Sequence, residues 1–297
     1  MGSLDRDGET CGLCGARGRP WRRKYGFSLL RCPHCGNGFV PKDRIPDDLE
    51  SMYSRAYFEG KEDTGYATYL ADSRVMQRNF ARRLRFVERL GPPGRRILDV
   101  GAAFGILLRT AREAGWDASG VEIAPDCAAE ASRLSGVPVV AGDFTRVPLE
   151  GSFDVIVMLD VIEHLRDPMA GLRRAYELLS PGGILLIETN DIDAPWARLL
   201  GNRWWFLDPP QHLFYFSLSG LKERLREVGF SDEFHTRRAG RRVSISNLLF
   251  KLSGGFPAGP VRKALVRASH ANVPASFYLN FGDAVLVAAR KPGRGVP

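Results

Sequence analysis

The sequence predicts an α/β fold built on a doubly wound, mainly parallel sheet, with a small cysteine-rich module in front of it. The first observation is Ile97–Val100, an apolar run of strand length that leads into Gly101 and Gly105. Apolar residues with helical spacing follow over 106–111, so this stretch is typical of a buried strand, a glycine turn and a helix. Strand-like and helix-like runs then alternate along the chain, which indicates right-handed crossovers between parallel strands.

Length and composition agree with one full α/β domain plus an appended module, because the 297 residues are 44% hydrophobic and 26% charged. The longest apolar runs, such as Phe153–Leu159, have strand length, so no membrane span is predicted. No charged start precedes an apolar stretch, so no signal peptide is expected and the cytoplasm is the expected location. The net charge of +8 permits an anionic partner, although such charges usually form a solvated surface.

The cysteine-rich module consists of two Cys-x-x-Cys pairs, Cys11 with Cys14 and Cys32 with Cys35. Each pair turns the chain tightly enough to direct two thiolates at one ion, and their separation is typical of a four-thiolate zinc ribbon. Thiols in a reducing cytosol seldom remain as disulfides, so zinc is favoured over disulfide bonds. We therefore predict a zinc ribbon over residues 1–45, with His34 as a solvent-facing neighbour of the metal and not a ligand.

The glycine turn offers backbone N–H groups and a close approach to a ligand. A dinucleotide fingerprint would need glycines at Ala103 and at position 106, so NAD and FAD are disfavoured. The run Asp99-Val-Gly101, followed by Gly105, instead resembles motif I of the class I S-adenosylmethionine (SAM) methyltransferases. Ala103 replaces the middle glycine of that family's motif, which is one departure from the pattern.

Acidic residues at the ends of the next two strands support this resemblance. Trp116–Glu122 is a predicted strand whose terminal carboxylate can accept both ribose hydroxyls of an adenosine group. Pro138–Ala141 is a third strand, followed by Asp143 and Phe144. In the family that this chain resembles, such an acidic residue binds the adenine amino group and its apolar neighbour packs on the ring. The predicted SAM site comprises Asp99, Gly101, Ala103, Phe104, Gly105, Glu122, Ile123, Asp143, Phe144, Leu159, Asp160 and His164.

The later strands complete a Rossmann-like, seven-stranded and mainly parallel sheet. Phe153–Leu159 and Ile184–Glu188 are predicted as the fourth and fifth strands, joined by a helix over 168–179 and a turn at 181–183. Phe230–Arg237 and Ala284–Ala289 are predicted as the last two strands, an antiparallel pair in the family. Asp160, Glu163, His164 and Asn190 should then lie at the carboxyl ends of the strands, where α/β sheets bind their ligands.

The remaining segments suggest how the acceptor is enclosed. Residues 46–90 are predicted to form an aromatic linker and a helical cap. The cysteine pairs, Phe39-Val-Pro41 and the aromatic run that ends at Phe58 together cover roughly residues 11–60. This stretch resembles the zinc-binding leader of many bacterial methyltransferases from polysaccharide and sugar-modifying gene clusters. Residues 91–297 form the predicted methyltransferase domain. Its segment around 192–216 resembles a substrate lid whose His212 faces the pocket, although Trp204 and Trp205 are equally well explained as packing anchors. Residues 243–281 are expected to be helical and apolar.

Two histidines are the predicted catalytic groups. A hydroxyl acceptor must lose its proton during methyl transfer, and a neutral imidazole or a metal can assist. We predict His212 as the base on the acceptor side and His164 as a pocket residue or secondary base. The stretch from Asp160 to His164, including Glu163, also resembles the Glu-x-x-Glu-His motif of ubiquinone-biosynthesis O-methyltransferases, which implies a second metal site for Mg²⁺ on Asp160, Glu163 and His164.

The predicted function is therefore methyl transfer from SAM to a small-molecule or glycan acceptor, most simply a hydroxyl group. An alternative is a ribosomal or transfer RNA methyltransferase whose basic ribbon binds nucleic acid. The ribbon's arginines, however, lack the interleaved exposed aromatics of a base-stacking surface, Trp21 and Tyr25 excepted. A binding protein with an inactive methyltransferase fold is a third alternative, which the intact Gly101, Glu122 and Asp143 disfavour. The sequence leaves open the identity of the acceptor, the atom that is methylated and the oligomeric state.

Overall fold

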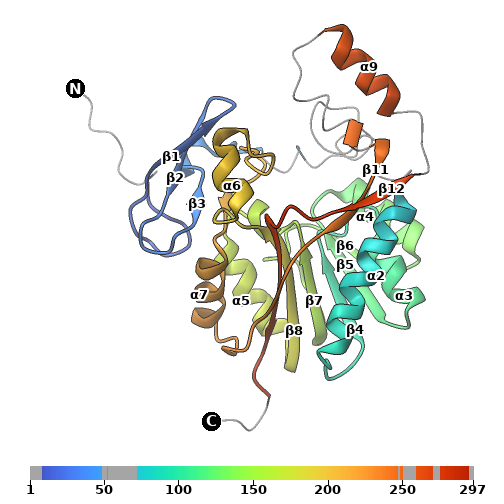
Figure 1. Ribbon diagram of the computed structural model, residues 1–297. Helices are drawn as coiled ribbons and strands as arrows, with labels where there is room; N and C mark the ends of the chain where they lie inside the picture. The colour runs from blue at the N-terminus through green and yellow to red at the C-terminus, as the bar shows by residue number, and fades with distance from the viewer. Residues whose placement is uncertain are drawn as a thin grey trace.

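The computed structural model describes residues 9–48, 52, 72–246, 248–249, 259–269 and 275–293. Within them, a seven-stranded sheet forms the centre of the molecule, and a small sheet near the N-terminus lies against one end of it (Figure 1). The strand order of the large sheet is β10-β13-β8-β7-β4-β5-β6. Its strands are β4 (Arg96–Val100), β5 (Asp117–Glu122), β6 (Val139–Ala141), β7 (Phe153–Leu159), β8 (Leu179–Asn190), β10 (His235–Arg238) and β13 (Ala284–Arg290).

The pairing confirms the predicted topology. Strands β4 to β8 of the large sheet pair in parallel, whereas β13 is antiparallel to both β8 and β10. The first strand, β4, lies in the middle of the order, so the chain reverses direction across the sheet between β4 and β7. At such a reversal the loops after adjacent strands diverge and leave room for a ligand.

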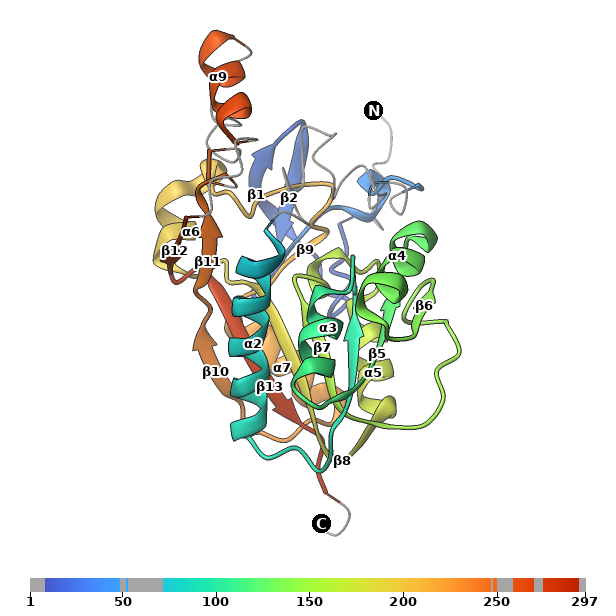
Figure 2. The same cartoon turned by 90° about the vertical axis from the view of Figure 1, so that its right-hand side faces the viewer.

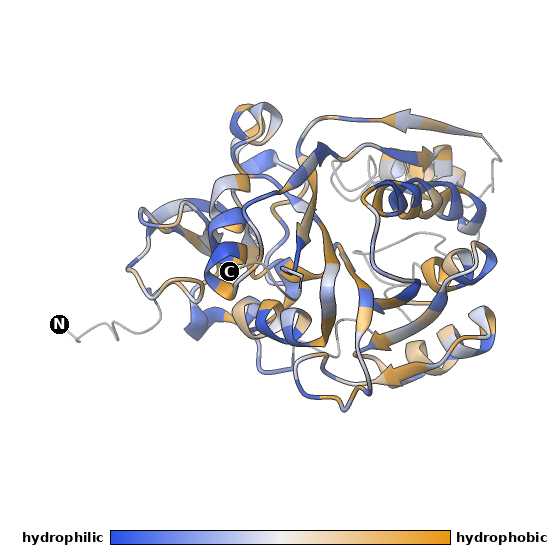
Figure 3. Ribbon diagram, turned by 90° about the horizontal axis from the view of Figure 1, so that it is seen from below, coloured by the Kyte–Doolittle hydropathy of each residue, from blue (hydrophilic) through white to orange (hydrophobic). Residues whose placement is uncertain are grey.

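Helices cover both faces of this sheet (Figures 1 and 2). Successive residues of β4 point to opposite faces: Ile97 packs in the cluster with helices α2 and α3, and Leu98 packs in the cluster with α5 and α7. Figure 3 shows the resulting pattern, with apolar strands between helices whose outer faces are polar. The helices are α2 (Ser73–Arg89), α3 (Ile106–Glu113), α4 (Pro125–Ser135), α5 (Pro168–Leu178) and α7 (Leu218–Val228).

The small sheet has the order β1-β2-β3-β9, and it joins the N-terminal module to the rest of the chain. Three of its strands come from the cysteine module, namely β1 (Arg19–Lys24), β2 (Phe27–Arg31) and β3 (Gly38–Phe39). The fourth, β9 (Phe214–Tyr215), comes from the end of the predicted lid and pairs antiparallel with β3. The module is therefore built into the larger domain through a shared sheet, which the sequence analysis did not anticipate.

Several boundaries differ from the sequence predictions. Residues 181–183 are part of β8 and not a separate turn. Gly182 takes a φ of 78° there, and the pairing of β8 with β7 is irregular between Phe153 and Val155 of β7. Strand β10 begins only at His235. The segment 192–216 contains α6 (Pro195–Leu200) and the 3-10 helix η4 (Gly201–Arg203) before it reaches β9.

The expectation that residues 243–281 are helical is wrong in part. The described residues of this segment include helical positions at 245–246 and 248–249 and the helix α9 (Pro260–Ser269), but also most of the antiparallel pair β11 (Arg241–Ser244) and β12 (Ser276–Leu279). Short strands of four residues carry too little periodicity to be recognised in a polar sequence. Tyr53, Tyr57 and Phe58 of the predicted aromatic linker lie outside the described residues, as does the start of the predicted cap before Asp72. No helix in the described part of the chain is long and apolar enough to cross a membrane.

Candidate functional site

The predicted SAM loop has the geometry of a ligand cradle. Gly101 and Gly105 take φ values of 76° and 75°, which only glycine adopts without strain. A Cβ on Gly101 would lie 2.7 Å from a methyl of Val161, and one on Gly105 would lie 2.8 Å from the carbonyl oxygen of Ala131. Ala103 also has a positive φ, 47°, so the departure from the family motif lies at a left-handed position that glycine would occupy more easily.

The two acidic residues after β5 and β6 lie at the same edge of the sheet as this loop. Glu122 accepts hydrogen bonds from the backbone N–H of Ala103 at 2.8 Å and of Ala124 at 3.2 Å. Burial raises the pKa of its carboxyl, and these backbone donors oppose the shift. Asp143 is more exposed and accepts from the backbone N–H and the hydroxyl of Thr145, both at 2.8 Å. The loop, the two carboxylates and the buried ring of Phe144 fit an adenosine group.

A network of four charged residues begins at the end of β7. Asp160 takes a φ of 55° there and pairs with the guanidinium of Arg241 at 3.2 Å. Arg241 also pairs with Glu188 at 3.2 Å, and Glu188 receives two bonds from Arg83, at 2.7 and 2.9 Å. Burial would raise the pKa of Asp160, but the charge of Arg241 and its hydrogen bond to the carboxylate act in the opposite direction, and the pKa lies below its ordinary value. Asp160 is therefore an anion held in a strained backbone position, a combination that is concentrated at functional sites.

The two predicted catalytic histidines lie against each other. The rings of His164 and His212 meet edge to face with their centroids 4.7 Å apart. The Nδ1 atom of His164 lies 2.8 Å from the carbonyl oxygen of Gln211, and that of His212 lies 2.8 Å from the carbonyl oxygen of Phe206. A carbonyl only accepts, so each Nδ1 carries the proton and each neutral ring has its lone pair on Nε2.

These two rings differ from each other in their surroundings. Burial, together with the neighbouring ring of His212, lowers the pKa of His164 to about 3, so His164 is neutral at pH 7. His164 belongs to the 3-10 helix η3 (Ile162–His164) that follows β7 directly. His212 lies on the predicted lid, where its ring stacks on Phe206 at an interplanar angle of 20°.

Glu163 joins the imidazole pair. Its carboxylate is almost completely buried, and neither oxygen has a hydrogen-bond partner among the residues that the structure describes. Burial and then the charge of Asp160 raise its pKa to about 8. One potential ligand atom from each of Glu163, His164 and His212 lies within 4.8 Å of the others. The second metal site was expected on Asp160, Glu163 and His164, whereas the structure brings His212 into the cluster and directs Asp160 to Arg241.

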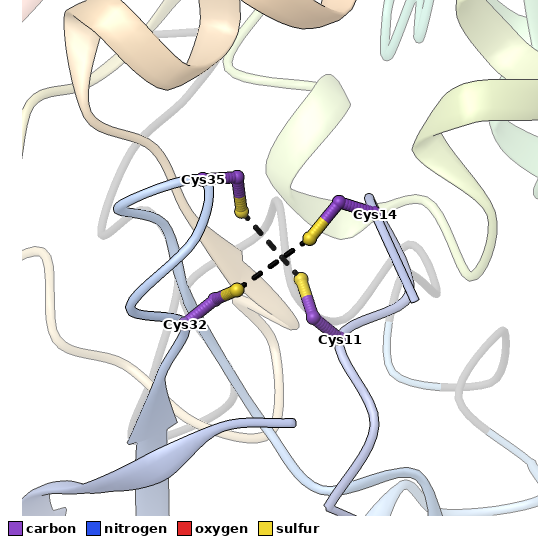
Figure 4. A group of neighbouring side chains, drawn as sticks. All are labelled: Cys11, Cys14, Cys32 and Cys35. Atoms are coloured by element: carbon purple, nitrogen blue, oxygen red, sulfur yellow. Dashed lines mark hydrogen bonds between the residues drawn. The ribbon is translucent and has the colours of Figure 1, made fainter. Parts of the chain in front are cut away.

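The four cysteines converge on one point (Figure 4). The Sγ atoms of Cys11 and Cys35 are 3.7 Å apart and those of Cys14 and Cys32 are 3.5 Å apart, too far for a disulfide bond. Four thiolates bound tetrahedrally at about 2.3 Å from one zinc ion would be separated by just under about 4 Å, so the spacing fits that ion. His34 is exposed beside them.

The tryptophan pair of the predicted lid divides into two roles. Trp204 is completely buried, and its Nε1 donates to Asp283 at 2.9 Å, so it is a packing anchor. Trp205 is 41% exposed and lies 5.0 Å from the ring of Phe281, which in turn lies 6.1 Å from Trp196. These three rings form an exposed aromatic surface that continues through Phe206 to His212.

Sequence reasoning missed Arg83, Glu188, Arg241 and Asn37. Arg241 lies between the predicted strand that ends at Arg237 and the segment that begins at residue 243, so no predicted element included it. The partners of Arg83 depend on how α2 packs, which no local pattern encodes. Asn37 follows the second cysteine pair at one residue's distance and is fully buried. A polar residue so close to a Cys-x-x-Cys pair could have been recognised as a candidate hydrogen-bond partner of the cysteines.

Comparison with known proteins agrees with this geometry. The methyltransferase domain family matches residues 71–233, more than half of the chain. A ubiquinone biosynthesis O-methyltransferase of Xanthomonas axonopodis pv. citri (strain 306) is 36% identical over 118 residues, which are 36% of this chain and 48% of that protein. One from Pseudomonas aeruginosa (strain UCBPP-PA14) is 33% identical over 112 residues, 34% of this chain and 47% of that protein. The chain thus spans about half the length of the curated relatives it matches.

Solved structures show the same fold at low sequence identity. The YcgJ protein of Bacillus subtilis superposes with a TM-score of 0.51 at 20% identity, over 72% of this chain and 98% of that one. Phosphoethanolamine N-methyltransferase 2 of Haemonchus contortus, solved in complex with S-adenosyl-L-methionine, has a TM-score of 0.51 at 18% identity, over 91% of this chain and 70% of that one. With the sheet order, the glycine loop and the family match in agreement, the chain belongs to the methyltransferase domain family and has its class I, Rossmann-like fold.

Proposed function

We propose that the protein transfers a methyl group from SAM to a hydroxyl group of a small-molecule or glycan acceptor. The observation that carries this proposal is the contact between His164 and His212, because both rings are fixed through Nδ1 to backbone carbonyls. The turn that carries His164 adjoins the SAM loop, since the side chain of Val161 faces Gly101. An acceptor that must lose a proton needs such a group, whereas methyl transfer to a neutral amine requires alignment above all.

SAM, when bound, supplies a methyl group that is already activated for in-line displacement. The residues of this chain then have separate tasks. Gly101 and Gly105 shape the loop, and Glu122 and Asp143 accept hydrogen bonds from the ribose and the adenine. His212 accepts the proton of the acceptor hydroxyl on Nε2. Asp160 places a negative charge near the imidazoles, which favours the imidazolium that forms.

The low pKa of His164 divides the work between the histidines. A base acts best when its pKa lies near the working pH. A pKa of about 3 makes His164 a poor base at pH 7, so it serves as a neutral hydrogen-bond acceptor that orients the substrate. His212, on the segment that encloses the acceptor, is the better base.

Two clusters of side chains are candidate metal sites. We assign one structural zinc ion to Cys11, Cys14, Cys32 and Cys35. The cluster of Glu163, His164 and His212 has two imidazoles and one carboxylate, a ligand set that suits first-row transition ions, whereas Mg²⁺ prefers oxygen ligands. The resemblance to the ubiquinone enzymes implies Mg²⁺ at this position, but these residues fit that ion poorly. We therefore assign the proton transfer to an imidazole.

The contacts of the ribbon favour a small acceptor over RNA. Arg22 donates to the carbonyl oxygens of Ala197 and Gly201, and Lys24 donates to that of Trp204. Arg31 forms a salt bridge with Asp193 at 2.9 Å. Cations that already dock the ribbon onto its own domain contribute little to binding phosphates.

The exposed aromatic surface suggests what the acceptor looks like. Trp196, Trp205 and Phe281 present partly exposed ring faces that lead towards His212. Such faces bind flat or apolar ring surfaces, including those of phenols and sugars. We therefore propose an acceptor that carries a ring next to its reacting hydroxyl.

The deciding experiment incubates the protein with SAM labelled in the methyl group and an extract of its host, and identifies the labelled product by mass spectrometry. We expect an O-methylated small molecule or glycan, formed by the wild type and lost with His212→Ala. Methyl label in RNA, together with RNA binding that persists when salt is added, would support the nucleic-acid alternative. Label on carbon or nitrogen, with turnover unaffected by His212→Ala, would contradict base catalysis by this residue.

A further inference from the structure

We propose that the zinc ribbon holds the segment that carries His212 in place, and that Asn37 is a positioning residue that connects the cysteine cluster to the strand that follows His212. This inference deepens the proposed function and rests on it, because it takes His212 as the residue whose placement matters.

The first step is the position of β9. This strand begins two residues after His212. Among the strands that the structure describes, its partner is β3 of the ribbon, with Gly38 opposite Tyr215 and Phe39 opposite Phe214. A strand of two residues has no stability of its own, so its position depends on β3.

Backbone bonds on both sides of Leu213 extend this connection to the catalytic cluster. The backbone N–H of Val40, just after β3, donates to the carbonyl oxygen of Leu213 at 2.8 Å. The N–H of Leu213 donates in turn to the carbonyl oxygen of Glu163 at 2.8 Å. The residue after His212 is therefore held between the ribbon and the helical turn that carries Glu163 and His164.

The second step is Asn37, which is fully buried between the two parts of the chain. Its Nδ2 donates to the Sγ of Cys35 at 3.4 Å, and its Oδ1 accepts from the backbone N–H of Ser217 at 2.8 Å. Ser217 caps α7 by accepting from the N–H of Gly220 at 3.0 Å. One amide side chain thus joins a predicted metal ligand to the residues that fix the far end of β9.

The packing around Gly220 shows how closely the two parts meet. A Cβ at this position would lie 2.4 Å from the carbonyl oxygen of Cys35 and 2.5 Å from the Oδ1 of Asn37. Both are groups of the second cysteine knuckle and its neighbour, and a backbone carbonyl cannot move aside as a flexible side chain can. A methyl group on α7 would therefore push the ribbon away while leaving all four thiol groups in place.

The expected consequence follows from the hydrogen bond of His212. Its Nδ1 proton is fixed by the carbonyl oxygen of Phe206 only while the segment between η4 and β9 keeps its path. If β3 moves, β9 loses its partner strand and the carbonyl oxygen of Leu213 loses the N–H of Val40. The ring of His212 can then exchange its proton between the two nitrogens.

The test compares the wild type with Gly220→Ala and Asn37→Leu in the full chain purified without chelator. Gly293→Ala is the matched control for Gly220→Ala, because a Cβ there meets nothing within 4 Å. Long-range ¹H–¹⁵N spectra of protein labelled in its histidines report which ring nitrogen of His212 carries the proton. Zinc content is measured by metal analysis and SAM affinity by calorimetry.

We expect His212 to show a single Nδ1–H tautomer in the wild type and in Gly293→Ala. In Gly220→Ala and Asn37→Leu we expect averaged signals from both tautomers, with SAM affinity changed by less than about threefold, since Gly101 and Gly105 pack against Val161 and Ala131 and not against the ribbon. Signals of the exposed His235, on β10, should stay the same in all four proteins.

An unchanged His212 tautomer in Gly220→Ala with SAM affinity intact would overturn the coupling. So would an unchanged tautomer after zinc is removed from the wild type. Neither result depends on methyl transfer, so a failure of the coupling is distinguishable from a failure of the proposed function, which His212→Ala tests separately.

Discussion

His164 and His212 meet edge to face at 4.7 Å, although one follows a strand of the central sheet and the other lies on a segment that leads into the ribbon's sheet. The first position is rigid, because the backbone of His164 continues directly from β7. The second depends on contacts far away in sequence. Their combination places a fixed neutral ring beside the proposed base, whose position the rest of the fold determines.

The first prediction concerns this pair. His212→Ala should lower turnover of the true acceptor by about 10²-fold or more while SAM affinity stays near that of the wild type, because a base acts in the transition state and not in cofactor binding. His164→Ala should lower turnover less, since its pKa of about 3 disqualifies it as a base at pH 7. Steady-state kinetics that follow formation of the labelled product measure the turnover of both variants. Near-normal turnover in both would exclude imidazole catalysis.

The second prediction concerns Glu122. Glu122→Ala should weaken SAM binding by about 1–3 kcal/mol, because the ribose hydroxyls lose their acceptor. The same change removes the acceptor for the N–H groups of Ala103 and Ala124, so the glycine loop should also loosen. Calorimetry measures the affinity. Glu122→Gln is the shape-matched control, and its SAM affinity should lie between those of the wild type and Glu122→Ala. Unchanged affinity in Glu122→Ala would remove the assignment of this site to SAM.

The central sheet could be predicted because its signals are local. Apolar strand runs, glycine turns and helical spacing alternate over residues 96–190, and the structure confirms their order. The glycine loop was recognisable despite Ala103, whose φ of 47° explains why the family pattern has a glycine there. These features depend on residues close together in the chain, which a sequence displays directly.

The rest depends on contacts that no local pattern records. Strand β9 consists of two residues and exists because β3, from the ribbon, lies beside it. Two salt bridges show the same dependence. One joins Asp160, just after β7, to Arg241 on β11, and the other joins Glu188 on β8 to Arg83 on α2. The error over residues 243–281 has the same origin, since β11 and β12 stabilise each other and are too short to be recognised alone.

The third prediction concerns the ribbon's metal. Protein purified without chelator should contain one equivalent of zinc by metal analysis, and Cys14→Ser should lose it and become much less soluble, because so small a module cannot build a sufficient core without the ion. The remaining soluble Cys14→Ser protein should bind SAM nearly as well as the wild type.

Cys127→Ala is the control for this experiment, since Cys127 is buried beside α4, away from the four converging cysteines. It should keep the full zinc content. Less than one equivalent of zinc in the wild type, or full zinc in Cys14→Ser, would count against the four-cysteine site.

The last prediction concerns Asp99 and the pH dependence of stability. Burial, and then the charge of Glu122, raise the pKa of the Asp99 carboxyl from 3.8 to about 8. Between these two values the folded protein keeps a proton that the unfolded chain has released, so the free energy of unfolding of the wild type falls as the pH rises through this window. Asp99→Asn has no such proton to lose. From about pH 4 to about pH 8, the wild type should therefore lose stability relative to Asp99→Asn. The difference between their unfolding free energies should change by an amount on the order of a few kcal/mol. Urea unfolding at a series of pH values measures it, with Asp117→Asn, whose side chain is 78% exposed, as the control for the change of charge. Curves for Asp99→Asn and the wild type that stay parallel over the whole window would show that Asp99 is ionised in the folded protein.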